Sequence, residues 1–146
     1  MYRVAYRYND DVVFYFDWAG NKYVASGGNV AWRINNPGLL HHHVASARRY
    51  GSIGSFGPYA IFPHPRNGHD ALTTWLHSKK YFYSTLHAIA RHYAPDSPDL
   101  YIQKLSSLID ISPTTKIKDL SQEEMDLLTL TIGTNFAVAV TKLRLK

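Results

Sequence analysis

The hydrophobic and polar positions of this chain change their period once, near Pro65. Before that point, "YRVAYRY" and "VVFYFDW" combine aromatic and β-branched residues with partial alternation, which is typical of strands. They flank "NDD", so they predict a β-hairpin that turns at Asn9–Asp11. "AGNK" then turns the chain into a third short strand, "YVAS". The first part of the chain therefore predicts a small antiparallel β-region.

From Pro65 onward the apolar residues recur at helical spacing. "RNGHDALTTWLHSKK" places Leu72, Trp75 and Leu76 on one face, and "STLHAIARHYA" has a similar apolar face. Each segment predicts a short helix.

Capping signals mark the next two helices. "SPDLYIQKLSSLID" begins with Ser97 as N-cap and Pro98 at the first helical position. Its expected apolar stripe consists of Tyr101, Leu105 and Leu108. "SQEEMDLLTLTIGTNFAVAV" begins with a capping box of serine and glutamate three residues apart, and predicts an apolar helix of some length.

The stretch "ASGGNVAWRINNPGLL", Ala25–Leu40, joins these two regions. A glycine pair and Asn-Pro-Gly favour backbone conformations that ordinary residues resist, so we expect a shaped loop rather than helix or strand. Its polarity predicts that residues 26–40 line a cleft between the β-region and the helical lobe, because a loop rich in glycine and amides is too polar to bury dry. The irregular span continues to residue 56, and "PYAIF" then predicts a brief strand. The whole pattern predicts one α+β domain over residues 1–146.

Composition narrows the chemistry. The chain has no cysteine, which excludes disulfides, thiolate zinc sites and cysteine nucleophiles. No apolar run is long enough to span a membrane, and "MYRVAYRYNDD" lacks the apolar core of a Sec signal. We therefore expect a protein made in the cytoplasm, with delivery to the periplasm or cell wall by a secretion system or phage as one route.

The formal net charge of +5 favours an acidic polymer as partner, either nucleic acid or bacterial cell wall. Aromatic residues make up 14% of the chain and suit stacking on bases or on sugar rings. The lysines and arginines form no stripe along a helix and no known nucleic-acid-binding signature, so nucleic acid is a weaker candidate partner than the cell wall.

Motifs for metal and nucleotide chemistry are missing. Adjacent histidines on an extended chain point to alternate sides, so His41, His42 and His43 do not face one ion without a special turn. There is no P-loop, dinucleotide fingerprint or Gly-x-Ser-x-Gly elbow. We expect neither a metal nor another cofactor.

Glycoside hydrolysis usually needs two carboxyl groups, one of them kept protonated by an apolar site. Most acids of this chain lie at expected helix ends or in the hairpin turn. Asp17 is the catalytic candidate, because it ends an aromatic strand beside Trp18, a setting that could raise its pKa or aim it at a sugar. An ordinary turn-starting aspartate is the alternative, and no second acid stands out.

The loop itself offers ligand-binding groups. Trp32 suits stacking on a sugar face, and Arg33 suits pairing with a carboxylate through its planar fork. Asn35 and Asn36 suit paired hydrogen bonds to N-acetyl and hydroxyl groups. The alternative is that Trp32 is core while the other three side chains bond to the backbone of the loop.

Three motifs carry a family resemblance. "GGNVAWRINNPGLL" resembles the "GG-x-x-AWRNNNPGN" signature of lysozyme-like domains found in phage virion proteins and type VI secretion effectors. "YAIFPHPRNGHDAL" and "ARHYAPDSPDLY" are similar to later motifs of that family, and the resemblance runs from about Gly20 to Leu128. It implies a lysozyme-like fold that binds peptidoglycan and cleaves its glycan strand. Ile34 and Leu39 stand where the family has asparagines. The family commonly has an acid before a glycine within the final helix, and the corresponding stretch here, "TLTIGTNFAVAV", holds no carboxylate.

Three functions follow from the sequence. The first is a muramidase-like hydrolase of the peptidoglycan glycan strand, or a degenerate relative that binds the wall. The second is a non-catalytic module that binds cell wall or protein, and the third is a basic nucleic-acid-binding domain.

Overall fold

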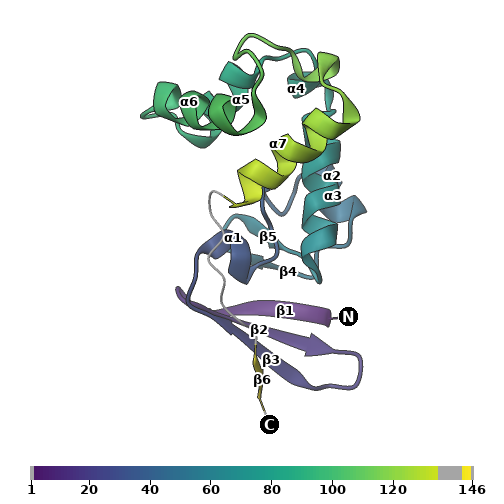
Figure 1. The fold of residues 1–146 in the computed structure, drawn as a ribbon. Helices are drawn as coiled ribbons and strands as arrows, with labels where there is room; N and C mark the ends of the chain where they lie inside the picture. Colours follow the sequence, from purple (N-terminus) through teal and green to yellow (C-terminus); the bar gives the residue numbers. More distant parts are fainter. Residues whose placement is uncertain (1, 135–142, 146) are drawn as a thin grey trace. The chain divides into compact units, whose positions relative to one another are not determined.

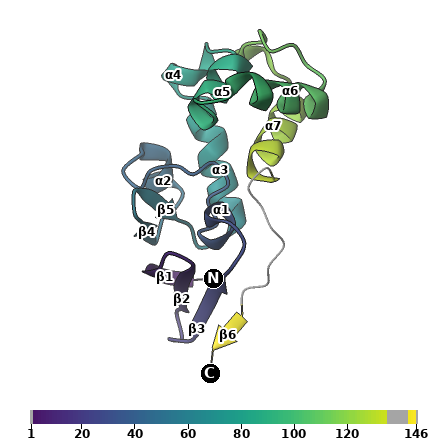
Figure 2. The same cartoon turned by 90° about the vertical axis from the view of Figure 1, so that its left-hand side faces the viewer.

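A computed structural model describes residues 2–134 and 143–145 of this chain (Figure 1). Four strands form an antiparallel sheet of order β1-β2-β3-β6, and two more form a separate hairpin. The sheet strands are β1 Tyr2–Asn9, β2 Val12–Asp17, β3 Lys22–Ser26 and β6 Leu143–Leu145. The separate hairpin pairs β4 Gly54–Phe56 with β5 Tyr59–Ile61. Figure 2 shows β6 beside β3 at the sheet edge, where Lys22 pairs with Leu145.

The predicted first hairpin is confirmed. β1 and β2 pair antiparallel around the turn at Asp10 and Asp11, and Asn9 Oδ1 accepts a hydrogen bond from the Asp11 amide at 2.8 Å. The side-chain amide of an asparagine at this position satisfies the turn backbone, which is why Asx residues are common there.

The α+β fold class is confirmed, because helices follow the N-terminal sheet. The helices are α1 Val30–Arg33, α2 Ala45–Arg49, α3 Pro65–Leu76, α4 Lys79–Phe82, α5 Leu86–Tyr93, α6 Pro98–Ile109, the 3₁₀ turn η1 Ile117–Asp119, and α7 Gln122–Thr134. The prediction that Ala25–Leu40 contains no helix is wrong for one helical turn, because α1 lies within that stretch. Asn29 explains the turn, because its Oδ1 accepts from the Trp32 amide at 3.0 Å and caps the helix.

The two capped helices form with one correction. In α7 the capping box is confirmed: the Glu124 amide donates to Ser121 Oγ at 3.1 Å, and the Ser121 amide donates to Glu124 Oε1 at 2.9 Å. The stripe predicted for α6 is wrong by about one position. Its buried residues are Ile102, Leu105 and Ile109, and Leu108 is exposed. The end of the predicted last helix, residues 135–140, lies outside the described residues.

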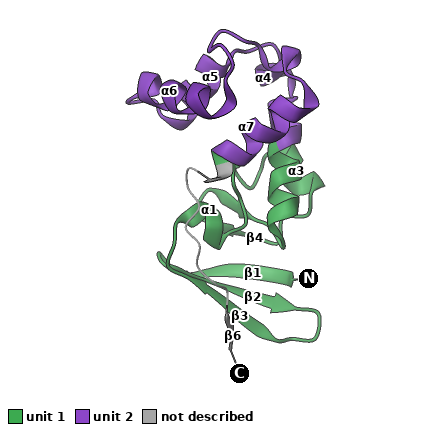
Figure 3. Cartoon of the chain, in the orientation of Figure 1, with its two compact units in different colours: residues 1–72, 132–146 green, residues 73–131 purple. Residues whose placement is uncertain are grey.

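The chain divides into two compact units (Figure 3). Unit 1 contains residues 1–72 and 132–146, and unit 2 contains residues 73–131. The unit boundaries fall inside α3 and α7. The single domain predicted for residues 1–146 stays a prediction, as does its lysozyme-like character.

Each unit has its own apolar core. In unit 1 the inner face of the sheet packs with residues of the loop and of the second hairpin: Ala5, Val13, Tyr15, Ala25, Ile34, Phe56 and Ile61. In unit 2 the buried residues include Leu86, Ile89, Leu105, Ile117 and Leu128. The sheet, the loop and the second hairpin therefore form one packed body in unit 1.

Candidate functional site

The loop over residues 26–40 is held by its own polar side chains. Arg33 is buried, and its Nη1 donates to the Gly27 and Gly28 carbonyls at 2.9 and 3.0 Å. Its Nη2 donates to the Asp10 carbonyl at 3.0 Å, across 23 residues of sequence. The Tyr15 hydroxyl donates in turn to the Arg33 carbonyl. The guanidinium thus ties the glycine turn to the first hairpin.

The Asn36 amide is completely buried and bonds only to main chain. Its Nδ2 donates to the Leu40 and Ala60 carbonyls at 2.9 and 3.0 Å, and its Oδ1 accepts from the Leu40 amide at 2.9 Å. Both N–H groups of this amide are therefore used. Asn36 fixes the end of the loop to strand β5.

Asn35 is also buried, and its Nδ2 donates to the Phe62 carbonyl at 2.9 Å. Its φ is +54°, in the left-handed region that asparagine tolerates better than most residues. The expectation that the loop is too polar to bury is wrong for these side chains, and the predicted cleft stays a prediction. Main-chain partners offset the cost of burying these amides.

Trp32 is half-buried and packs against the unit 1 core, as in the alternative that makes it a core residue. The ligand-binding roles predicted for Trp32, Arg33, Asn35 and Asn36 stay predictions. In the structure, all four side chains take part in the packing of unit 1.

Asp17 caps the turn between β2 and β3. Its Oδ1 accepts from the Ala19 and Asn21 amides, both at 2.9 Å, and its Oδ2 accepts from Asn21 Nδ2 at 3.0 Å and the Tyr23 hydroxyl at 3.3 Å. The hydrogen bond from the Asn21 side chain is the largest cause that lowers the pKa of Asp17. The expectation of a raised pKa is therefore wrong, and Asp17 is ionised at neutral pH. Its catalytic role stays a prediction. An ionised carboxylate would act as nucleophile, base or charge stabiliser and not as the general acid.

A general acid of the lysozyme type requires an apolar site that keeps a carboxyl group protonated. All eleven acids fall within the described ranges, and each is exposed or half-buried. Several have local partners that account for them, including Asp126, whose Oδ1 accepts from Gln122 Nε2 at 2.9 Å. No acid of this chain therefore lies in a buried apolar site within its unit.

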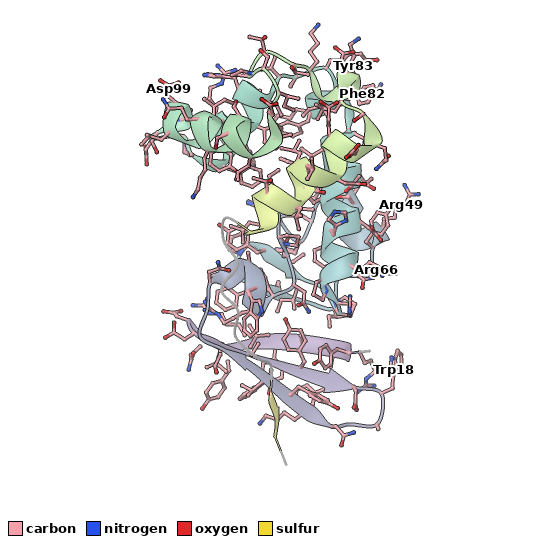
Figure 4. All side chains as sticks on the ribbon, viewed as in Figure 1. Trp18, Arg49, Arg66, Phe82, Tyr83 and Asp99 are labelled. Carbon is pink, nitrogen blue, oxygen red and sulfur yellow. The ribbon has the colours of Figure 1, made fainter. Side chains whose placement is uncertain are left out.

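A cavity of about 380 Å³ lies at the start of α3, lined by His64, Arg66, Asn67 and Asp70. Arg66 projects outward from this helix (Figure 4). Asp70 is the single carboxyl group of the lining, whereas glycoside hydrolysis by the usual mechanism needs two. No group of three or more His, Cys, Asp or Glu residues that could hold a metal ion occurs in residues 2–134 and 143–145.

The charge of the chain is unevenly divided. Unit 1 holds ten of the sixteen lysines and arginines but only four of the eleven acids, so its formal charge is +6. Unit 2 holds six lysines and arginines and seven acids, a formal charge of −1. An acidic partner is attracted mainly to unit 1.

Sequence reasoning missed a group of aromatic side chains on the outer face of the sheet: Tyr6, Tyr8, Phe14 and Phe16. The signal was in the strand pattern, because β2 carries aromatic residues at both parities, with Phe14 and Phe16 on one face and Tyr15 on the other. Alternation sends one parity into the core and leaves the other on the opposite face. Aromatic residues at both parities therefore indicate a second apolar face.

Comparisons with known proteins identify no relative: no family model, curated protein or solved structure matches this chain. Within the part of the chain that the structure describes, no helix is long and apolar enough to cross a membrane.

Proposed function

We propose that this chain is a non-catalytic module that binds the glycan of bacterial peptidoglycan. The observation that carries the proposal is the concentration of positive charge in unit 1, whose formal charge is +6. Peptidoglycan is an acidic polymer, since the peptides on alternate sugars carry carboxylates. Long-range attraction brings such a polymer to the basic unit.

The resemblance to lysozyme-like domains supports the wall as the partner. The residues that this chain shares with the first family motif, notably Arg33 and Asn36, hold the loop through main-chain hydrogen bonds. Because these residues build the scaffold of unit 1, the motif has a structural role that does not depend on catalysis.

The positions of the carboxyl groups favour binding over hydrolysis. Each acid is exposed or half-buried, and the pKa of Asp17 is lowered, the wrong direction for a general acid. Loss of a general acid typically reduces the rate by about 10²–10⁴-fold. These positions support a wall-binding surface with negligible turnover over a hydrolase.

Two measurements on one preparation test this proposal. We expect the protein to sediment with insoluble peptidoglycan at low salt, to be released as salt screens the charges, and to leave a cell-wall suspension turbid. A protein that stays in the supernatant at low salt would refute wall binding.

The muramidase alternative has a distinct outcome in the same test. If the wild type clears the suspension and Asp17→Asn abolishes clearing while circular dichroism shows the variant still folded at the assay temperature, the chain is a hydrolase and Asp17 is catalytic. If single-stranded DNA displaces the protein from the wall at equal charge concentration, the nucleic-acid alternative gains support.

A further inference from the structure

In the described residues, the outer face of strands β1 to β3 carries four aromatic rings and the ammonium group of Lys22. We call Tyr6, Tyr8, Phe14, Phe16 and Lys22 the aromatic face. Strand register places them together, because Tyr6 pairs with Phe14 and Phe16 pairs with Lys22. The residues of opposite parity form the unit 1 core, so these side chains point away from it.

The rings of the aromatic face touch one another and form a continuous surface. Tyr6 lies edge-on to Phe14 at 5.7 Å and is stacked with Phe16 at 5.8 Å, both between ring centroids. Tyr8 lies 4.6 Å from Phe14 by the same measure. Tyr6 is 46% exposed and Tyr8 is 64% exposed. Phe14 and Phe16 are half-buried beside these tyrosines, and a contiguous apolar patch that reaches the surface in this way is typical of an interaction site.

Lys22 adds a charge to this surface. Its Nζ lies 4.0 Å from the centroid of the Phe14 ring, an attraction between cation and ring that holds the ammonium on the face. A ligand that stacks on the neighbouring rings therefore meets a positioned cation.

We infer that the aromatic face is the surface that takes the glycan strand, with sugar rings stacked on Tyr6 and Tyr8 and a stem-peptide carboxylate paired with Lys22. This inference rests on the proposed function and names its site. Sugar rings present C–H groups on one face, which pack on aromatic rings while their hydroxyls stay in water.

The charge pattern favours glycan over nucleic acid on this face. Single-stranded nucleic acid needs a groove of cations that follows the phosphates from one nucleotide to the next. Of the described side chains, Lys22 is the cation that lies over these rings. Arg7, on the same hairpin, is paired with Asp10 and lies 4.7 Å from the Phe56 ring of the core. Among the side chains that the structure describes, one cation beside several rings matches a ligand that carries its charges on alternate sugars.

Tyr8→Ala tests the inference, and Tyr83→Ala is its matched control. Tyr83 is 63% exposed and projects from the end of α4 in unit 2 (Figure 4), so the two variants remove equally exposed rings. We expect Tyr8→Ala to weaken sedimentation with peptidoglycan about tenfold, the size of one lost stacking contact. Tyr83→Ala and Tyr8→Phe should remain within about twofold of the wild type.

A charge variant and a measurement on the wild type complete the test. Lys22→Gln should weaken binding and reduce its salt dependence. In the wild type, muramidase-solubilised glycan fragments should shift the NMR signals of the Tyr6 and Tyr8 rings and leave Tyr83 unshifted. This measurement does not depend on the folding of any variant.

The outcomes separate the two proposals. Wild-type protein that fails to sediment refutes the proposed function. A second outcome refutes only the aromatic face. In it, the wild type and Tyr8→Ala sediment equally well, and the Tyr6 and Tyr8 rings show no shifts. Two other outcomes assign the aromatic face to a different occupant and so refute the inference. In one, Tyr8→Ala reduces single-stranded DNA binding tenfold while its wall binding is unchanged. In the other, the wild type is a dimer in sedimentation velocity and Tyr8→Ala dissociates that dimer.

Discussion

Gly68 approaches Asn35 so closely that a Cβ atom on Gly68 would lie 2.0 Å from the Asn35 carbonyl oxygen. The same Cβ would lie 2.8 Å from Cδ of Pro37. The first turns of α3 therefore pack directly on the backbone of the loop that contains Asn35 and Asn36, and only glycine permits this contact.

Gly68→Ala should therefore destabilise unit 1. Alanine is the better helix former by about 1 kcal/mol, but the overlap with rigid backbone costs more, and we expect a net loss of about 2 kcal/mol in the free energy of unfolding. Chemical denaturation measures it. Gly20→Ala is the control: its Cβ meets open space, and only its φ of +84° is unfavourable, which costs about 1 kcal/mol. Equal losses in the two variants would contradict the close packing.

Asn36→Ala should reduce stability by about 3 kcal/mol, because it leaves the buried Leu40 amide and Ala60 carbonyl without their side-chain partner. The buried amide reverses the usual expectation for a ligand-binding asparagine, whose loss affects binding more than stability. Thermal and denaturant unfolding give the value. Asn67→Ala, which removes one bond to the Tyr50 carbonyl at 3.2 Å, should cost about 1 kcal/mol. A fully stable Asn36→Ala would show that the loop has other supports.

Asp17 should contribute a pH-dependent part of the stability. Hydrogen bonds lower its pKa in the folded state, so the contribution is present above its ordinary pKa of 3.8 and is lost as the pH falls through the lowered folded value. We expect Asp17→Asn to melt at a lower temperature than the wild type at pH 7. The difference should shrink as both proteins are acidified. Melting curves between neutral and strongly acidic pH measure it, and a difference independent of pH would contradict the carboxylate's role in the turn.

Ser121→Ala should cost about 1 kcal/mol, since the Ser121 hydroxyl accepts the Glu124 amide at the start of α7. Ser97 provides the matched control. It is the N-cap of α6, yet its side chain makes no capping hydrogen bond, so Ser97→Ala should change the stability by less than about 0.5 kcal/mol. The comparison uses two serines at the same helical position, and an equal loss in both would contradict the capping geometry.

The sequence by itself determined the elements whose signals are local. The first hairpin depends on Asn9 and the two aspartates that follow, and the start of α7 depends on Ser121 and Glu124, three residues apart. These partners are neighbours in the chain, so their patterns are readable before folding. The low pKa of Asp17 has equally local causes, in residues 19–23, which a reading of its apolar neighbours overlooked.

Only the tertiary structure decided the roles of the loop and of the sheet face. Arg33, Asn35 and Asn36 bond to carbonyls that are 23 to 27 residues away, and no pattern within the loop distinguishes such a partner from a ligand. The same holds for β2, whose aromatic residues occupy both parities. The loop and the second hairpin cover Tyr15 and leave Tyr6 and Tyr8 outside, because a sheet buries whichever face the rest of its core packs against.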